Sequence, residues 1–213
     1  MIRKILLASI FLLGSQAVFA QQDPADKFKE GTHYFTIKQA QAPSNDDSVE
    51  VMVVFSYYCG HCNTMEPYIK SWAQKKPDNV KMDRMHVNFG GISEMMARGY
   101  IVAEMTGIAD ESHTAMMDAI WKQGKRFRSP EQLADFYTDF GLEKSRFMAN
   151  YKSFAADSQL RRVGQNTQLW GITGTPSVII NRKYRVPNTS VVWNVVDYLV
   201  AKEIALASES TAP

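Results

Sequence analysis

The sequence has no apolar run long enough to cross a membrane and almost no excess of one charge. A membrane-spanning helix needs about 20 apolar residues, whereas the one stretch of this kind covers residues 5–13. Lys and Arg number 24 against 22 Asp and Glu, and the excess equals the two charges of Arg3 and Lys4. Because basic residues are scattered among acidic ones, we do not expect a nucleic-acid-binding surface.

The first twenty residues have the order of a secretory signal peptide. Arg3 and Lys4 precede the apolar residues 5–13, and the small residue Ala20 offers a cleavage site before Gln21. An uncleaved membrane anchor is the alternative. We predict a signal peptide at residues 1–20 and a soluble, exported mature chain.

Cysteine is equally scarce. The chain has 2 cysteines, Cys59 and Cys62, and both lie in one tetrapeptide with Gly60 and His61. A stabilising disulfide gains most by closing a long loop, and this pair would close a very short one, so it looks reactive rather than structural. A passive disulfide and a zinc site are the alternatives. A closed zinc site needs four ligands, and without a second cysteine pair the further candidates are His61 and His86.

Patterns of apolar residues predict an α/β fold. Residues 49–57 form a β-branched and aromatic run that is typical of a buried central strand, and Cys59 follows it at the start of a helix. A strand, a helix and a second strand in succession imply a parallel crossover. Strand signals are absent between about residues 91 and 155, which predicts an all-helical insertion in a domain of residues 21–213. The expected strands cover residues 33–37, 49–57, 80–89, 177–181 and 184–186, and the expected helices cover residues 63–75, 92–106, 112–123, 130–140, 143–154, 157–170 and 190–206.

A Cys-x-x-Cys motif at a helix start is suited to thiol chemistry. Unpaired N–H groups and the partial positive charge of a helix N-terminus stabilise a thiolate, so Cys59 is the expected nucleophile. Cys62 is turned into the helix within reach of the same sulfur and is expected to resolve a mixed disulfide. His61 can donate to the thiolate or place a positive charge beside it, which lowers the pKa of Cys59 and favours an oxidant. Gly60 leaves the loop backbone freer than a proline would.

The segment Gly174-Thr175-Pro176, ahead of a predicted strand, is the second informative feature. Taken alone, it predicts only a turn. Beside a thioredoxin-like motif, we expect the Thr175-Pro176 bond to be cis and the main chain of Thr175 to pair with an extended substrate.

Together these segments resemble the DsbA family of periplasmic dithiol oxidants. The likeness lies in residues 54–62, 80–89 and 174–181 and extends over nearly the whole mature chain. It implies a thioredoxin fold interrupted by a helical lobe and donation of disulfide bonds to reduced exported proteins in the periplasm. It also implies reoxidation by a quinone-linked membrane oxidase of the DsbB kind. We expect a monomer that needs no cofactor and no metal.

Three positions depart from the family pattern. The dipeptide between the cysteines is Gly-His where the family usually has Pro-His, Thr175 replaces a typical Val, and Val53 stands where the central strand usually has a buried acid. Glu66 and Arg84 match the family's buried acid–base pair beneath the active site, where they are expected to tune the redox chemistry. The alternative is a charge on a helix surface and another on a strand edge.

Two further functions stay open. Gly60 and Thr175 also fit a disulfide isomerase or reductase of the same fold. A module that holds exported peptides without turnover would need a groove but not two thiols. The methionines of the helical segment are expected mainly in the core, with one of the adjacent pair Met116 and Met117 facing a groove. We assign the four tryptophans to packing.

Overall fold

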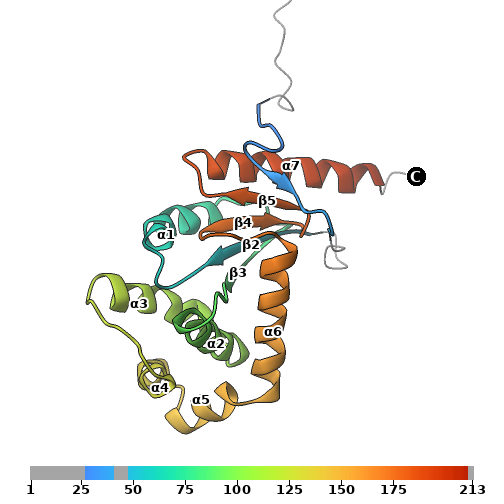
Figure 1. The fold of residues 1–213 in the computed structure, drawn as a ribbon. Coiled ribbons are helices and arrows are strands. Elements are labelled where there is room, and N and C mark those ends of the chain that lie inside the picture. Colours follow the sequence, from blue (N-terminus) through green and yellow to red (C-terminus); the bar gives the residue numbers. More distant parts are fainter. Residues whose placement is uncertain (1–26, 41–47, 211–213) are drawn as a thin grey trace, which may run out of the picture.

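The computed structural model describes residues 27–40 and 48–210, and these contain one five-stranded sheet. The strands are β1 (Phe35–Thr36), β2 (Val49–Phe55), β3 (Val80–His86), β4 (Ser177–Ile180) and β5 (Tyr184–Pro187). Their order is β1-β5-β4-β2-β3 (Figure 1). Strands β2 and β3 are parallel, and the other neighbours are antiparallel. The signal peptide predicted for residues 1–20 lies outside the described residues.

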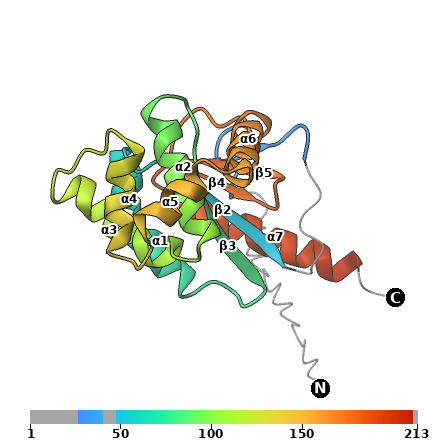
Figure 2. The same ribbon diagram turned by 90° about the horizontal axis from the view of Figure 1, so that it is seen from below.

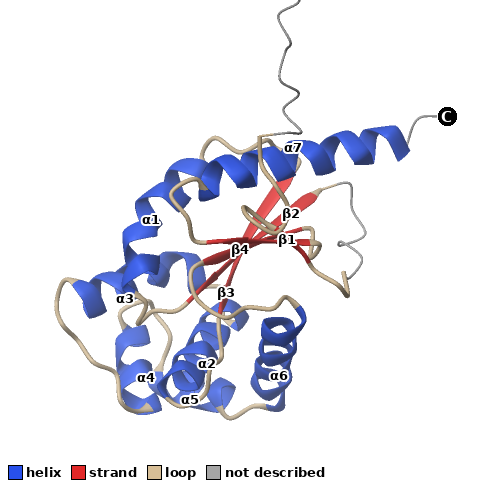
Figure 3. Ribbon diagram, turned by 45° about the horizontal axis from the view of Figure 1, so that its top comes forward, coloured by secondary structure: helices blue, strands red, loops and turns tan. Residues whose placement is uncertain are grey.

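Seven helices accompany the sheet in the described part of the chain. They are α1 (Gly60–Ala73), α2 (Ile92–Met105), α3 (Ala109–Trp121), α4 (Pro130–Thr138), α5 (Lys144–Tyr151), α6 (Phe154–Leu169) and α7 (Val192–Ser210). Helices α1 and α7 cover one face of the sheet, and α2 to α5 form a lobe on the other side together with the long α6 (Figures 1 and 3). None of the described helices is long and apolar enough to cross a bilayer.

Strand β2 lies inside the sheet, between β4 and β3, and its side chains are buried on both faces of the sheet. Val51 and Val53 pack against residues of α1 and α7, whereas Val54 packs near Trp170 at the end of α6. A β-branched run suits such a strand. The parallel pairing of β2 with β3, connected through α1, confirms the predicted crossover.

The described residues bury two large hydrophobic clusters. The sheet core lies between the sheet and helices α1 and α7, and its members include Val49, Val51, Val53, Ile69, Val178, Val196 and Leu199. The lobe core lies between the lobe helices and the end of β2, and its members include Phe55, Tyr57, Cys62, Met116, Ile120, Leu133 and Phe147. Helix α1 contributes to both cores, and Cys62 belongs to the lobe core.

The predicted fold class, a thioredoxin fold with an inserted helical lobe, is confirmed. The differences are at the ends of elements. The strand expected at residues 33–37 is shortened to Phe35–Thr36, and α3 begins at Ala109, before the predicted residue 112. Helix α4 begins at Pro130, as predicted. Ser129 is its N-cap, and the side-chain oxygen of Ser129 accepts a hydrogen bond from the Gln132 N–H.

The expectation that Met116 or Met117 faces a groove is wrong. Both side chains are buried in the lobe core. Helix α3 contacts α2 as well as α1, so two adjacent residues of α3 can each face a packed neighbour. Met96 is also buried, and Met95 and Met105 are half-buried. The methionines of the lobe therefore serve mainly as core residues.

Candidate active site

Cys59 occupies the N-cap of α1, just beyond the carboxyl end of β2. The chain leaves β2 at Phe55 and makes a short turn, in which the Cys59 N–H donates to the Ser56 carbonyl over 3.0 Å. Cys59 has extended backbone angles, and its Sγ accepts a hydrogen bond from the Cys62 N–H at 3.4 Å. Cys59 is half-buried and Cys62 is buried. This is the predicted arrangement of an accessible sulfur beside a covered one.

The two thiols have opposite pKa shifts. The pKa of Cys59 is lowered to about 5, chiefly by a hydrogen bond from the Cys62 thiol, with contributions from Thr175 and from the N–H groups of Cys62 and His61. Burial opposes this shift. The pKa of Cys62 is raised, first by its hydrogen bond with Cys59 and then by burial. At neutral pH Cys59 is therefore a thiolate, whereas Cys62 remains a protonated thiol.

Thr175 lies against the reactive sulfur. In its protonated form the Cys59 thiol donates to the Thr175 carbonyl over 3.2 Å, although the two residues are far apart in the sequence. The contact arises because β4, which follows Pro176, pairs with β2. The Thr175–Pro176 bond is cis, as predicted.

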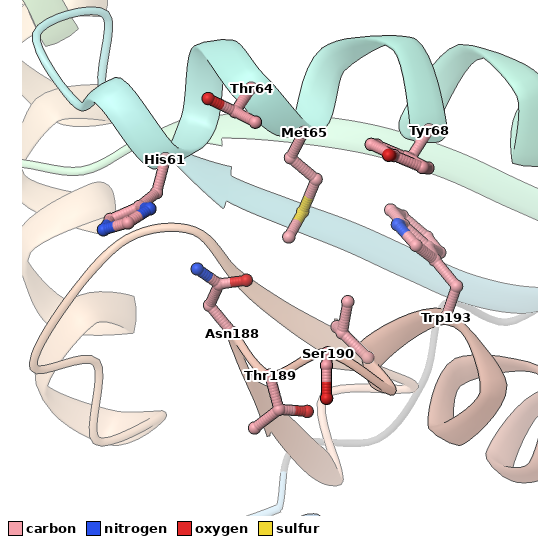
Figure 4. Close-up of a pocket in the computed structure, with 9 residues that line it drawn as sticks. His61, Thr64, Met65, Tyr68, Asn188, Thr189, Ser190 and Trp193 are labelled. Atoms are coloured by element: carbon pink, nitrogen blue, oxygen red, sulfur yellow. The ribbon is translucent and has the colours of Figure 1, made fainter.

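The ring of His61 faces a cavity beside helix α1. The side chain is exposed, and it lines one end of a cavity of about 300 Å³ between α1 and the loop from β5 to α7 (Figure 4). Met65, Tyr68 and Trp193 line the same cavity. Among the hydrogen bonds of the described residues, none joins the His61 ring to a sulfur atom, so the expected donation to Cys59 comes from the backbone N–H of His61 instead.

Glu66 and Arg84 form a pair beneath the active site. Arg84 Nη2 lies 3.4 Å from Glu66 Oε2, and both side chains are largely buried, at 12% and 11% exposed. Burial, the largest influence, raises the pKa of Glu66. The hydrogen bond and charge of His113 and the charge of Arg84 outweigh burial, so the net pKa is lowered. The predicted acid–base pair is present, and the alternative of two surface charges is wrong.

Two lobe residues at this site were not predicted. His113 Nε2 lies 2.9 Å from Glu66 Oε1. Trp121, assigned to packing from the sequence, is partly exposed and donates from Nε1 to the Tyr57 carbonyl over 2.9 Å. A Cβ at Gly60 would contact the Trp121 ring at 3.4 Å, so this tryptophan packs beside the redox loop.

The sequence contained a signal for His113. It lies on the same helical face as Met116, Met117 and Ile120, with the spacing of a buried stripe. A lone polar residue in such a stripe must find a buried partner.

The remaining sequence expectations concern Val53 and a metal. Val53 is fully buried in the sheet core, so β2 has an apolar side chain where the family pattern has an acid. His86 is buried beneath Tyr57 and accepts a hydrogen bond from the Tyr57 N–H at 3.1 Å. Within residues 27–40 and 48–210, no three His, Cys, Asp or Glu side chains come close enough to hold a metal ion.

Known proteins are similar to this chain in sequence and in fold. Residues 50–200 match the family model of the DSBA-like thioredoxin domain. The thiol:disulfide interchange protein DsbA of Pseudomonas aeruginosa is 30% identical over 97% of this chain and 100% of its own length, and that of Azotobacter vinelandii is 33% identical over 94% and 98%.

Solved structures agree with this relationship. The crystal structure of Pseudomonas aeruginosa DsbA has a TM-score of 0.80 and 32% identity, covering 86% of this chain and 98% of that one. The oxidoreductase DsbA from Xylella fastidiosa has a TM-score of 0.77 and 28% identity, covering 81% and 96%. The chain therefore belongs to the DsbA family and is a thiol:disulfide oxidoreductase.

Proposed function

We propose that this protein is an oxidant, which donates its Cys59–Cys62 disulfide to reduced exported proteins. The observation that carries the proposal is the difference between the two thiols. The pKa of Cys59 is lowered to about 5 and the pKa of Cys62 is raised. A thiol of low pKa is a good leaving group, which makes its disulfide easy to transfer.

The reaction proceeds by two exchanges. A substrate thiolate attacks Cys59 Sγ of the disulfide form, the Cys59–Cys62 bond breaks, and the Cys62 thiolate takes up a proton. A second substrate thiolate then attacks the substrate sulfur of the mixed disulfide and displaces the Cys59 thiolate. The substrate loses two electrons, and the protein is left in the dithiol form.

The surroundings of Cys59 are suited to an extended substrate segment. The Thr175 carbonyl, 3.2 Å from Cys59 Sγ, can accept a backbone N–H of the segment. Pro176 follows it and lacks an N–H of its own. The apolar cavity lined by His61, Met65 and Trp193 then receives a neighbouring side chain of the substrate. Gly60 sets the backbone freedom of the loop between the cysteines.

Regeneration requires an external oxidant. We assign this step to a quinone-linked membrane oxidase of the DsbB kind, which would accept the two electrons from the dithiol form. The support is the family relationship, together with the predicted signal peptide, which would deliver the chain to the periplasm. In this scheme the monomer needs no cofactor of its own.

An isomerase or reductase is the second candidate. Gly60 and Thr175 favour it, because both differ from the residues usual in the oxidants of the family. The lowered pKa of Cys59 favours the oxidant, since a poor leaving group would serve a reductant better.

Equilibrium with glutathione buffers of known potential tests the proposal. We expect a reduction potential well above that of cytosolic thioredoxin, which is about −270 mV. The disulfide form should also oxidise a reduced, unfolded exported protein. A potential near the thioredoxin value would support the reductase instead, and two thiols that exchange with neither reagent would leave only a peptide-binding module.

A further inference from the structure

His113 is a buried residue of the lobe that contacts both flanks of the redox motif. Its Nε2 lies 2.9 Å from Glu66 Oε1, and its Nδ1 lies 3.3 Å from the Tyr57 hydroxyl. Tyr57 precedes Cys59 by two residues, and Glu66 follows Cys62 by about one turn of α1. One imidazole therefore joins the two ends of the short segment that contains both cysteines.

The bonding pattern fixes the form of this imidazole. An ionised carboxylate only accepts hydrogen bonds, so Nε2 donates to Glu66 and Nδ1 accepts from the Tyr57 hydroxyl. Burial, the largest influence, lowers the pKa of His113, which agrees with a neutral ring at neutral pH. Both nitrogens thus have partners, as a buried polar group requires.

The surroundings hold the ring in place. His113 is 2% exposed, and the rings of Phe55 and Tyr57 lie 4.9 Å and 5.4 Å from it between centroids. The titratable and charged groups that face it are Glu66 and Lys70 of α1, Arg84 and His86 of β3, Tyr100 of α2, and Tyr57.

A second contact from the same helix acts on the same residue. Trp121, two turns beyond His113, donates to the Tyr57 carbonyl over 2.9 Å. Helix α3 therefore holds Tyr57 by its side chain and by its backbone. Helices α3 and α1 are in contact, and Figure 2 shows them side by side.

We propose that His113 is a positioning residue for thiol exchange, which holds Tyr57 and Glu66 so that Cys62 stays aligned to attack a mixed disulfide at Cys59. The proposal rests on the proposed function, because it assigns His113 to the regeneration of the disulfide form, in which Cys62 resolves a mixed disulfide between Cys59 and the external oxidant. In this step the Cys62 thiolate attacks Cys59 Sγ, the bond from Cys59 to the partner sulfur breaks, and the proton lost from Cys62 ends on the released thiol.

The test measures this step alone. The full-length mature protein is prepared with glutathione bound to Cys59, and the release of glutathione by Cys62 is followed in a single turnover. In His113→Leu we expect release to slow on the order of tenfold, because small misalignments of reacting groups reduce rates strongly. His113→Gln should stay within roughly twofold of the wild type, since its amide offers both a donor and an acceptor.

His33→Leu is the matched control. His33 is half-buried outside both cores, and its Nδ1 accepts from the Lys29 N–H. Its substitution should leave glutathione release unchanged.

Two results would overturn the proposal. One is a His113→Leu protein that melts at a lower temperature but releases glutathione at the wild-type rate. The other is a His113→Gln protein that is as slow as His113→Leu. If His113→Leu does not fold, Tyr57→Phe removes only the hydroxyl that His113 contacts: slower release supports the proposal, and an unchanged rate contradicts it. Failure of the proposed function is detected separately, by a low reduction potential of the wild-type protein. The glutathione-release experiment does not depend on that measurement.

Discussion

The sheet core and the lobe core differ in the side chains they bury, although α1 packs into both. The sheet core is largely aliphatic, and most of its members are valines from the strands and α7. The lobe core is rich in aromatic rings and methionines, includes the sulfur of Cys62, and adjoins the buried polar cluster of Glu66, Arg84 and His113. The difference indicates that the sheet core holds the scaffold, whereas the lobe core supports the thiol chemistry.

Removing the buried sulfur should have the largest effect on activity. In Cys62→Ser we expect turnover to fall to background, because the Cys59–Cys62 disulfide cannot form and a mixed disulfide at Cys59 has no second protein thiol to attack it. Covalent complexes with substrates should accumulate on non-reducing gels. Cys59→Ser is the control and should give neither turnover nor complexes. A Cys62→Ser protein that retains normal turnover would show that the lobe core has no part in the exchange.

A large-to-small change in the sheet core should affect stability without affecting the thiols. Leu199 is fully buried there, so Leu199→Ala should lower the free energy of unfolding by about 2–5 kcal/mol. Denaturant titration measures this loss, and the ultraviolet absorbance of the thiolate measures the pKa of Cys59. The pKa should stay at its wild-type value, and a clear shift would contradict the separation of the two cores.

His61→Ser should have the smallest effect of the three. The His61 ring faces the cavity beside α1, and the backbone N–H groups that lower the pKa of Cys59 remain in the variant. We expect the pKa of Cys59 to rise slightly and the reduction potential to fall by about 30 mV, which corresponds to roughly 1.4 kcal/mol for a two-electron couple. If the pKa of Cys59 returned to that of a free thiol, the ring of His61 would control the thiolate, and the helix start would contribute little.

The features predicted from the sequence are those set by short-range pattern. A buried strand followed by Cys-x-x-Cys places Cys59 at a helix start, and Thr175-Pro176 before a strand marks the opposing loop. The resemblance to a family added Glu66 and Arg84. These positions follow from the order of residues in a short segment or from the resemblance to the family, so they can be found from a single sequence.

The features that the sequence did not reveal depend on packing between distant segments. His113 and Tyr57 are 56 residues apart and meet only because α3 packs against α1. The direction of the His61 ring was also not predictable, because the motif fixes its backbone but not its rotamer. The burial of both Met116 and Met117 was not predictable for the same reason. It depends on how many helices pack around α3, and the sequence of α3 alone does not reveal that number.

The central claim is that the fold stabilises the thiolate of Cys59, and thermal unfolding of the two redox forms tests it most directly. In the reduced protein the folded pKa of Cys59 is about 5, below that of a free thiol. This contribution is fully present above the pKa of the free thiol and is lost as the pH falls through about 5. The disulfide form lacks it and gains little from closing so short a loop. We predict that the reduced form melts at the higher temperature at neutral pH and that its advantage shrinks on acidification. An oxidised form that melts higher at neutral pH would contradict the account.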